Sequence, residues 1–153
     1  MIRIVPVIDH RVRALCVHEY PGHPKVCPNF GKRANCPPTA PYFERIFDMG
    51  SPIYAVVNEF DIDGHFRRMK EKHPGWSDRQ AYCPLYWQPK ARKALRLKVE
   101  DALKELPAEY VPETCPEALG VDVTATLAAV GVMLEWPARS TARQVTFLAR
   151  KLF

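Results

Sequence analysis

Five cysteines are the residues of this chain best suited to chemistry, and four of them directly precede a proline. A following proline holds a cysteine in an extended conformation and removes the next backbone N–H donor. Such a thiolate can project from an irregular loop toward a shared centre, and a proline also follows the last cysteine of the bacterial ferredoxin run. The pattern predicts a metal or cluster site. The four steps are Cys27-Pro28, Cys36-Pro37, Cys83-Pro84 and Cys115-Pro116.

The cysteine-rich loop, residues 16–41, carries the strongest signal for this site. Its spacing is Cys16-x10-Cys27-x8-Cys36-Pro37-Pro38, so three cysteines fall within 21 positions and bringing them together costs little loop-closure entropy. Zinc ribbons and fingers use pairs of ligands two to four residues apart, and this chain has no Cys-x2-Cys pair. Thiolates also suit iron–sulfur clusters. We expect an iron–sulfur cluster, [4Fe–4S] in type, with zinc as the alternative cofactor.

A metal site in which the protein supplies all four ligands needs one ligand besides Cys16, Cys27 and Cys36. Cys115 follows an expected strand and precedes an expected helix start, a common place for a positioned ligand. Cys83 lies in a helical, aromatic stretch, where a buried structural thiol is an equally simple interpretation. His18 and His23 are further alternatives, and imidazole would favour zinc or a Rieske-type cluster. We predict that the metal ligands are Cys16, Cys27, Cys36 and Cys115.

An enzymatic version of the site uses only three protein ligands. A four-iron cluster on Cys16, Cys27 and Cys36 would leave one iron open to substrate, where it acts as a Lewis acid. Electron transfer is the other role for such a cluster. No spacing singles out an acid–base partner, and each candidate carboxylate is equally interpreted as a surface residue. The candidates are Glu117, Asp122, Glu19 and Asp61.

Positive charge follows Cys27 in the same loop, at Lys32 and Arg33. Charge beside a thiolate-rich centre favours the bound anion, and it equally suits a phosphate-bearing substrate. We predict that these two residues bind the cofactor or an anionic small molecule. A redox partner is the other expected partner. The chain has no Gly-rich phosphate loop, Ser-His-Asp pattern or His-Glu-x-x-His motif.

Composition predicts one compact domain, residues 1–153, in a reducing compartment. The chain is 47% hydrophobic and 25% charged, which is ordinary for a globular protein, and it has no apolar run long enough for a membrane helix. The apolar start is too short for a signal peptide. We therefore expect a cytoplasmic protein that makes no membrane contact. In that compartment clustered cysteines bind metal or do chemistry more often than they form disulfides.

Alternating strand and helix patterns predict an α/β or α+β domain with helices packed on a small mixed sheet. Pro6 marks a strand edge or a strand end, and Gly131 ends a helix. The expected strands are 2–8, 52–58, 110–111 and 132–136. For 143–152 the composition slightly favours a strand over a helix. The expected helices are 41–49, 62–72, a stretch opened by a Ser77-to-Gln80 capping box, 89–106 and 121–130.

A rival function comes from the basic face of the helix at 89–106. The excess of Lys and Arg gives a net charge of +5, and several of these residues lie between 90 and 98. A zinc-stapled nucleic-acid or protein-interaction module is therefore the alternative. Nucleic acid is the less favoured partner, because no aromatic stacking pattern is visible beside that basic face in the sequence.

Two blocks of the sequence carry recognisable motifs, Cys27-Pro-Asn-Phe-Gly-Lys-Arg-Ala-Asn-Cys36-Pro-Pro and the segment 115–126. The first resembles a Cys-x-x-Tyr-Gly…Cys-Pro-Pro signature, and the second is similar to a Glu-Ala-x-Gly-Ile-Asp-Val block. Both belong to a bacterial and archaeal family of cysteine-rich predicted metal-binding proteins of unknown function, which this chain resembles. The resemblance implies metal binding by Cys27 and Cys36, with Cys16 at a preceding cysteine position. Many members have a second group of closely spaced cysteines that this chain lacks, so it implies one centre rather than two.

Overall fold

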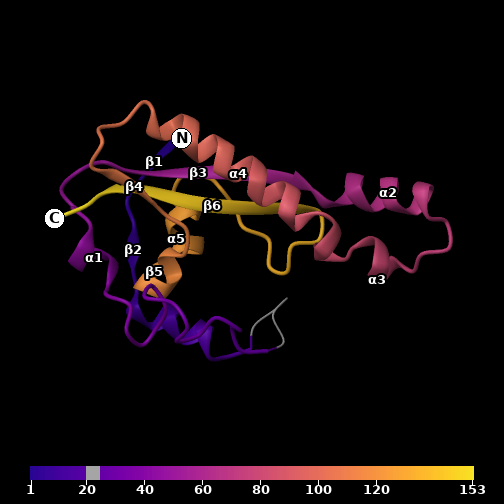
Figure 1. The fold of residues 1–153 in the computed structure, drawn as a ribbon, viewed down its shortest axis with the longest axis horizontal. Helices are drawn as coiled ribbons and strands as arrows, with labels where there is room; N and C mark the ends of the chain where they lie inside the picture. The colour runs from indigo at the N-terminus through magenta and orange to yellow at the C-terminus, as the bar shows by residue number, and fades with distance from the viewer. Residues whose placement is uncertain (20–24) are drawn as a thin grey trace.

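A four-stranded antiparallel sheet forms the centre of the computed structural model, which describes residues 1–19 and 25–153. The strand order is β1-β3-β6-β4, and a second small sheet pairs β2 with β5, also antiparallel. Helices pack against these strands, so the expectation of an α+β fold is confirmed (Figure 1). The strands are β1 (Ile2–Ile4), β2 (Val7–Ile8), β3 (Ile53–Asp61), β4 (Tyr110–Glu113), β5 (Val121–Asp122) and β6 (Thr141–Arg150).

Both faces of the central sheet are covered, because successive side chains of a strand point to opposite faces. Ala55 of β3 and Phe147 of β6 belong to one core cluster, which also includes buried residues of α1 (Phe43–Ile46) and α5 (Val123–Ala128). Val56 and Leu148, the next residues along, pack instead under α4 (Gln88–Leu103). Figure 1 shows α4 lying along one side of the sheet, with α5 and β5 on the other.

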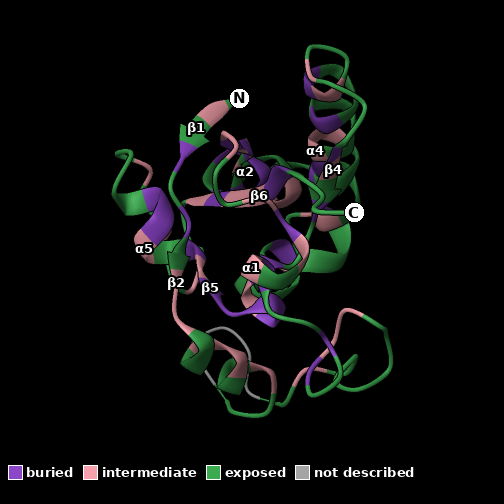
Figure 2. Ribbon diagram, turned by 90° about the vertical axis from the view of Figure 1, so that its left-hand side faces the viewer, coloured by how far each residue is buried: buried purple, intermediate pink, exposed green. Residues whose placement is uncertain are grey.

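Pro6 divides the expected 2–8 strand between the two sheets. Residues Ile2–Ile4 pair with β3, and Val7–Ile8 pair with β5. Proline has no N–H to donate to a ladder, so the chain changes partner at this position. The prediction of a strand end at Pro6 is confirmed. The switch leads the chain away from the main sheet toward the cysteine-rich loop, much of which is exposed (Figure 2).

The helices between β3 and β4 follow the sequence signals closely. α2 (Ile62–Lys72) has the expected bounds, and the Ser77–Gln80 capping box opens α3 (Asp78–Ala81). A short 3-10 helix, η2 (Pro84–Tyr86), precedes α4, which has Pro89 in its first turn. No helix in the described part of the chain has both the length and the apolar character that crossing a membrane requires.

The expected strand at 132–136 is wrong. After α5, Gly131 adopts a left-handed conformation and the N–H of Val132 donates back to the carbonyl of Leu127, as in a Schellman motif. The segment then crosses to β6 as a loop. The side chain of Arg143 donates a hydrogen bond to the Met133 carbonyl oxygen at 2.8 Å and holds this loop in place. Val132 and Leu134 pack partly against the core without pairing in a sheet, so strand composition misled the prediction.

Two other differences affect the candidate site. The expected helix at 121–130 starts only at Val123, because Val121 and Asp122 pair with β2. Two short 3-10 helices were not expected. They are η1 (His10–Cys16) and η3 (Pro116–Leu119), and they contact each other. This contact brings the N-terminal cysteine segment beside Cys115.

Candidate metal centre

Cys16 is the last residue of η1, and the start of that helix is fixed by Asp9. The Asp9 side chain accepts a hydrogen bond from the N–H of Arg11, with 3.0 Å between Oδ1 and N. The Asp9 N–H donates to the carbonyl oxygen of Gly120 at 2.9 Å. Since Gly120 directly follows η3, this bond holds the Cys16 helix beside the helix that Cys115 precedes.

Gly120 permits the close approach of η1 and η3. Its φ of +89° lies in the left-handed region, which side chains rarely adopt. A Cβ at this position would lie 2.8 Å from Cδ2 of His10 and 3.3 Å from its Cα. The His10 ring cannot easily yield, because it stacks on Tyr42 with centroids 3.7 Å apart and its Nε2 lies 2.7 Å from Oε1 of Glu44. A side chain at position 120 would therefore push the two helices apart.

Cys27 and Cys36 lie on consecutive turns of the cysteine-rich loop. The Cys27 N–H donates to the Cys16 carbonyl at 3.1 Å, which brings the loop back to the end of η1. The Cys36 carbonyl accepts the N–H of Ala40 at 2.9 Å. Arg13 of η1 donates from Nη2 to the Ala40 carbonyl at 2.9 Å. These bonds connect both cysteines to η1.

Cys115 lies between the end of β4 and the start of η3, the context that the sequence predicted. Its N–H donates to Oε1 of Glu113 at 2.8 Å, and its carbonyl accepts the N–H of Ala118 at 3.0 Å. The residue is exposed, and it lines a recess in the protein. Burial within these walls raises the pKa of the Cys115 thiol to about 12.

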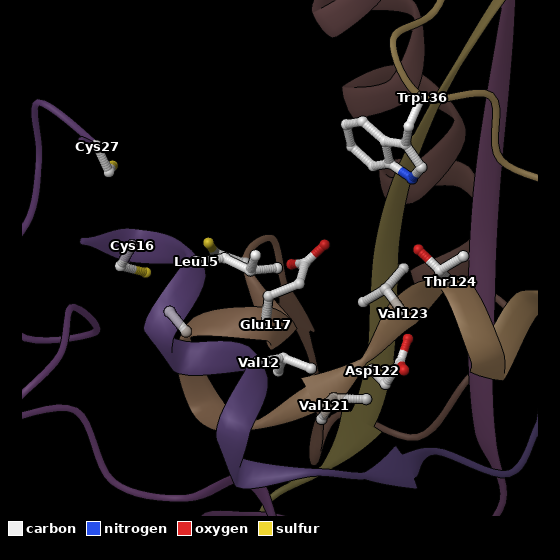
Figure 3. A pocket seen from close by; sticks show the side chains of 12 residues that line it. Val12, Leu15, Cys16, Cys27, Glu117, Val121, Asp122, Val123, Thr124 and Trp136 are labelled. Carbon is white, nitrogen blue, oxygen red and sulfur yellow. The ribbon is translucent and has the colours of Figure 1, made fainter. Parts of the chain in front are cut away.

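Cys16, Cys27 and Cys115 line one cavity of about 460 Å³. Figure 3 shows Cys16 and Cys27 on one side of this cavity, with Glu117 between them and Trp136. Loops, η1, η3 and the β5–α5 junction all contribute to its walls. The remaining lining residues are Val12, Leu15, Ala118, Val121, Asp122, Val123 and Thr124.

The groups around this cavity carry charge of one sign when they ionise. Burial raises the pKa of the Cys16 thiol, and the nearby Cys27, Cys36 and Glu117 raise it further, while Arg13 opposes them. Burial is likewise the largest cause of the raised pKa of Glu117. Cys36 does not line the cavity, but its effect on Cys16 places it within electrostatic range. The structure therefore gathers acidic groups around Cys16 with little positive charge among them.

The described residues do not form a ready-made coordination site. Within residues 1–19 and 25–153, no three His, Cys, Asp or Glu side chains are grouped closely enough to hold a metal ion. His18 is exposed and lies outside the cavity lining. His23, the other predicted alternative, lies outside the described residues. Ligation by the four predicted cysteines therefore requires their side chains, and the loop turns that carry them, to draw closer.

Of the predicted acid–base candidates, Glu117 is best placed for chemistry. Asp61 and Asp122 have structural roles as N-caps, accepting the N–H of Gly64 at 2.9 Å and of Ala125 at 2.8 Å. Glu19 is exposed and outside the lining of the cavity. Glu117 lines the cavity between the thiols and the apolar wall.

The remaining predicted residues lie away from the cavity. Lys32 and Arg33 are exposed on the turns between Cys27 and Cys36, and neither lines the cavity. Cys83 is half-buried immediately before η2 and directly follows Tyr82, whose ring stacks on Phe66 of α2; it does not line the cavity either. This placement separates Cys83 from the other four cysteines.

Comparison with known proteins adds no relative to this description. A scan against protein-family models found no match, and neither did searches of curated proteins and of solved structures. The resemblance to the cysteine-rich metal-binding family therefore stays a prediction from the two sequence blocks.

Proposed function

We propose that the protein binds one metal centre through Cys16, Cys27, Cys36 and Cys115. The observation that carries this proposal is the meeting of three cysteines from separate segments at one cavity. Cys16 and Cys27 approach it from the N-terminal side, and Cys115 approaches it from the β4–η3 junction. Cys36 is linked to the same helix, η1, through the Arg13–Ala40 bond.

A bound cation would resolve the electrostatic conflict among these groups. Each thiolate near Cys16 disfavours the next, and Glu117 adds to the repulsion. A metal ion that coordinates a thiol deprotonates it and turns the repulsion into attraction toward a shared centre. Raised thiol pKa values in the metal-free protein are therefore compatible with ligands that become thiolates only when metal binds.

An iron–sulfur cluster suits this set better than zinc. Every proposed ligand is a soft thiolate, and none is paired with a neighbour at zinc-finger spacing. The cavity of about 460 Å³ also has more space beside the thiols than a single ion needs. Such a cluster would supply electron transfer, or Lewis-acid chemistry if one iron had no protein ligand. We place it in a cytoplasmic protein that serves a redox partner or an anionic substrate, which Lys32 and Arg33 would attract.

Purification without oxygen, followed by metal analysis and a visible spectrum, tests the proposal. A brown protein that absorbs broadly near roughly 400 nm and contains about four irons per chain supports the cluster. A colourless protein with about one zinc per chain supports the zinc version and contradicts the cluster. A protein that contains neither metal, and takes up neither after reduction and incubation with iron and sulfide or with zinc, contradicts the metal centre.

A second function is favoured by the surface between α2 and α4. From Ile62 to Lys98 the chain has ten Lys and Arg residues against three Asp and Glu, while the whole chain has a net charge of only +5. Figure 1 shows α2 and α3 extending beyond the end of the central sheet. Aromatic side chains stack within this surface: Phe66 stacks on Tyr82, and Tyr86 lies against Trp76 and is 55% exposed.

The surface between α2 and α4 combines basic residues with aromatic side chains for stacking. Proteins that bind single-stranded nucleic acids use the same combination. Fluorescence anisotropy with a labelled oligothymidine tests it. Binding that falls steeply with salt and weakens on Tyr86→Ala, but not on Leu152→Ala, an exposed residue outside this surface, supports this function. Binding that is absent at low salt, or unchanged by salt, excludes it.

A further inference from the structure

The cavity has two chemically different ends. Cys16, Cys27 and Cys115 provide the thiol end. At the other end lie Trp136 and Val123, and Figure 3 shows Glu117 between the two groups. The apolar end contains no cysteine, so a metal held by the thiols makes no use of it. This end is therefore a separate feature that the metal centre does not explain.

Glu117 presents a hydrogen-bond acceptor to this space. The carboxyl group of Asp122 beside it accepts the N–H of Ala125 and caps α5, whereas the Glu117 carboxyl group interacts with its own backbone N–H and lines the cavity. In Figure 3 the Glu117 carboxyl group points away from the protein wall and toward the space below Trp136. A carboxyl group has an oxygen that can accept a hydrogen bond in either protonation state. Glu117 is thus a built-in partner for a donor group.

The dimensions and walls of the cavity fit an organic molecule. Small-molecule sites have volumes of roughly 300–1,000 Å³, mostly apolar walls and a few polar groups that fix orientation. The whole cavity, thiol end included, has a volume of about 460 Å³, which lies in this range. Apolar side chains from three segments form its walls, namely Leu15 of η1, Ala118 of η3 and Val123 of α5. Thr124 adds a hydroxyl group near the start of α5.

We propose that the apolar end binds a small organic molecule that has an apolar body and one hydroxyl or amine donor for Glu117. The molecule lies beside the thiol end, so it is a candidate substrate or ligand of the metal centre. The inference rests on the proposed function in one respect: it assumes that the cysteine thiols bind metal and do not contact the organic molecule. Burial of the apolar body against Trp136 and Val123 supplies affinity, and the donor supplies orientation.

Three probes of similar size test this inference: benzyl alcohol, toluene and benzoate. Binding is followed by the NMR signal of the Trp136 indole N–H, assigned with the Trp136→Phe variant. We expect benzyl alcohol to shift this signal and to bind roughly tenfold more tightly than toluene, which has no donor. Benzoate, which carries an acceptor where a donor is needed, should bind more weakly than benzyl alcohol.

Glu117→Leu should abolish the preference for benzyl alcohol over toluene, while the surface variant Glu100→Leu should keep it. No shift of the Trp136 signal with any probe overturns the inference, and so does an unchanged preference in Glu117→Leu. Glu117→Gln, which keeps the size of the side chain and an oxygen that accepts a hydrogen bond, gives a second variant. It should keep the preference for benzyl alcohol over toluene, and loss of that preference would contradict Glu117 as the acceptor.

The Cys16→Ser, Cys27→Ser double variant separates this inference from the proposed metal centre. It should lose metal yet still bind benzyl alcohol, because the apolar end and Glu117 are unchanged. A wild-type protein that binds metal but none of the probes overturns the inference and leaves the metal centre standing. A protein that binds benzyl alcohol but never takes up metal supports the inference and overturns the metal centre.

Discussion

The backbone N–H of Cys27 donates to the carbonyl oxygen of Cys16 at 3.1 Å, although ten residues separate the two cysteines in the chain. This bond places two proposed ligands at neighbouring positions and makes the end of η1 the organising point of the loop. Gly120 and Asp9 in turn anchor η1 to η3, which follows Cys115. The geometry of the thiols therefore depends on the contact between two short helices.

Replacement of Gly120 should disrupt this contact. In Gly120→Ala the new Cβ would lie 2.8 Å from Cδ2 of His10, at a φ of +89°. We expect a loss of about 3 kcal/mol in the free energy of unfolding, from left-handed strain of about 1–2 kcal/mol together with overpacking of about 1–3 kcal/mol. Urea denaturation measures this loss.

Gly131→Ala is the matched control for Gly120→Ala. Gly131 also has a positive φ, +81°, but nothing lies within 4 Å of its ideal Cβ. It should therefore lose only the strain of about 1–2 kcal/mol and keep its metal content. Equal losses in the two variants would show that η1 does not press on Gly120.

Alkylation of Cys115 should be slow in the metal-free protein even though the residue is exposed. With a pKa of about 12, roughly one thiol in ten thousand is ionised at pH 8. Because a more basic thiolate is also more nucleophilic, we expect iodoacetamide to react roughly fifty-fold more slowly than with an ordinary thiol. Mass spectrometry of the peptide that contains Cys115 measures the rate.

The same cysteine in urea is the reference for this rate, because unfolding removes the walls of the cavity. The rate in the folded protein should also increase about tenfold per pH unit between pH 8 and 11, since the thiolate fraction does so. If folded and unfolded Cys115 react equally fast at pH 8, solvent reaches the thiol freely and the proposed burial is wrong.

His65 should make the fold less stable in mild acid. It is 6% exposed on α2, its Nε2 has no hydrogen-bond partner, and burial, Arg68 and Lys90 lower its pKa. A histidine whose folded pKa lies below the unfolded value of 6.5 binds its proton less readily in the folded state. The free energy of unfolding should therefore fall as the pH drops below about 6.5, and continue to fall until the folded pKa is passed.

Thermal unfolding from pH 5 to pH 8 measures this effect. His65→Leu should be less sensitive to acid than the wild type, because no proton has to be bound when the protein unfolds. His18→Gln, which changes an exposed histidine outside α2, is the matched control substitution. A wild type and a His65→Leu variant with parallel pH profiles would contradict this account.

Local signals in the sequence predicted much of the fold. The capping box at Ser77, the proline at position 89 and the strand break at Pro6 each act within a few residues, so their outcome does not depend on distant contacts. The segment 132–136 shows the limit of this approach. Its composition suits a strand, but the Schellman motif at Gly131 and the bond from Arg143 hold it as a loop.

The cavity could be predicted only in part, because its walls come from contacts distant in sequence. The cysteine spacing indicated the residues at its thiol end, and Cys115 was favoured over Cys83 from its local context. Trp136 carried no such signal, since it lies in a loop 20 residues after η3 begins. The N-cap residue Asp9 is a local sequence feature of η1. The position of η1 in the fold, however, depends on the distant hydrogen bond from Asp9 to the Gly120 carbonyl oxygen.

Metal content of Cys115→Ser and Cys83→Ser, each purified without oxygen beside the wild type, tests the central claim most directly. Both variants remove one thiol that a proline follows, but only Cys115 lines the cavity with Cys16 and Cys27. We predict that Cys83→Ser keeps the wild-type amount of metal per chain and that Cys115→Ser loses most of it or holds it weakly against a chelator. Full, chelator-resistant metal in Cys115→Ser, with loss of metal in Cys83→Ser, would contradict the proposed centre.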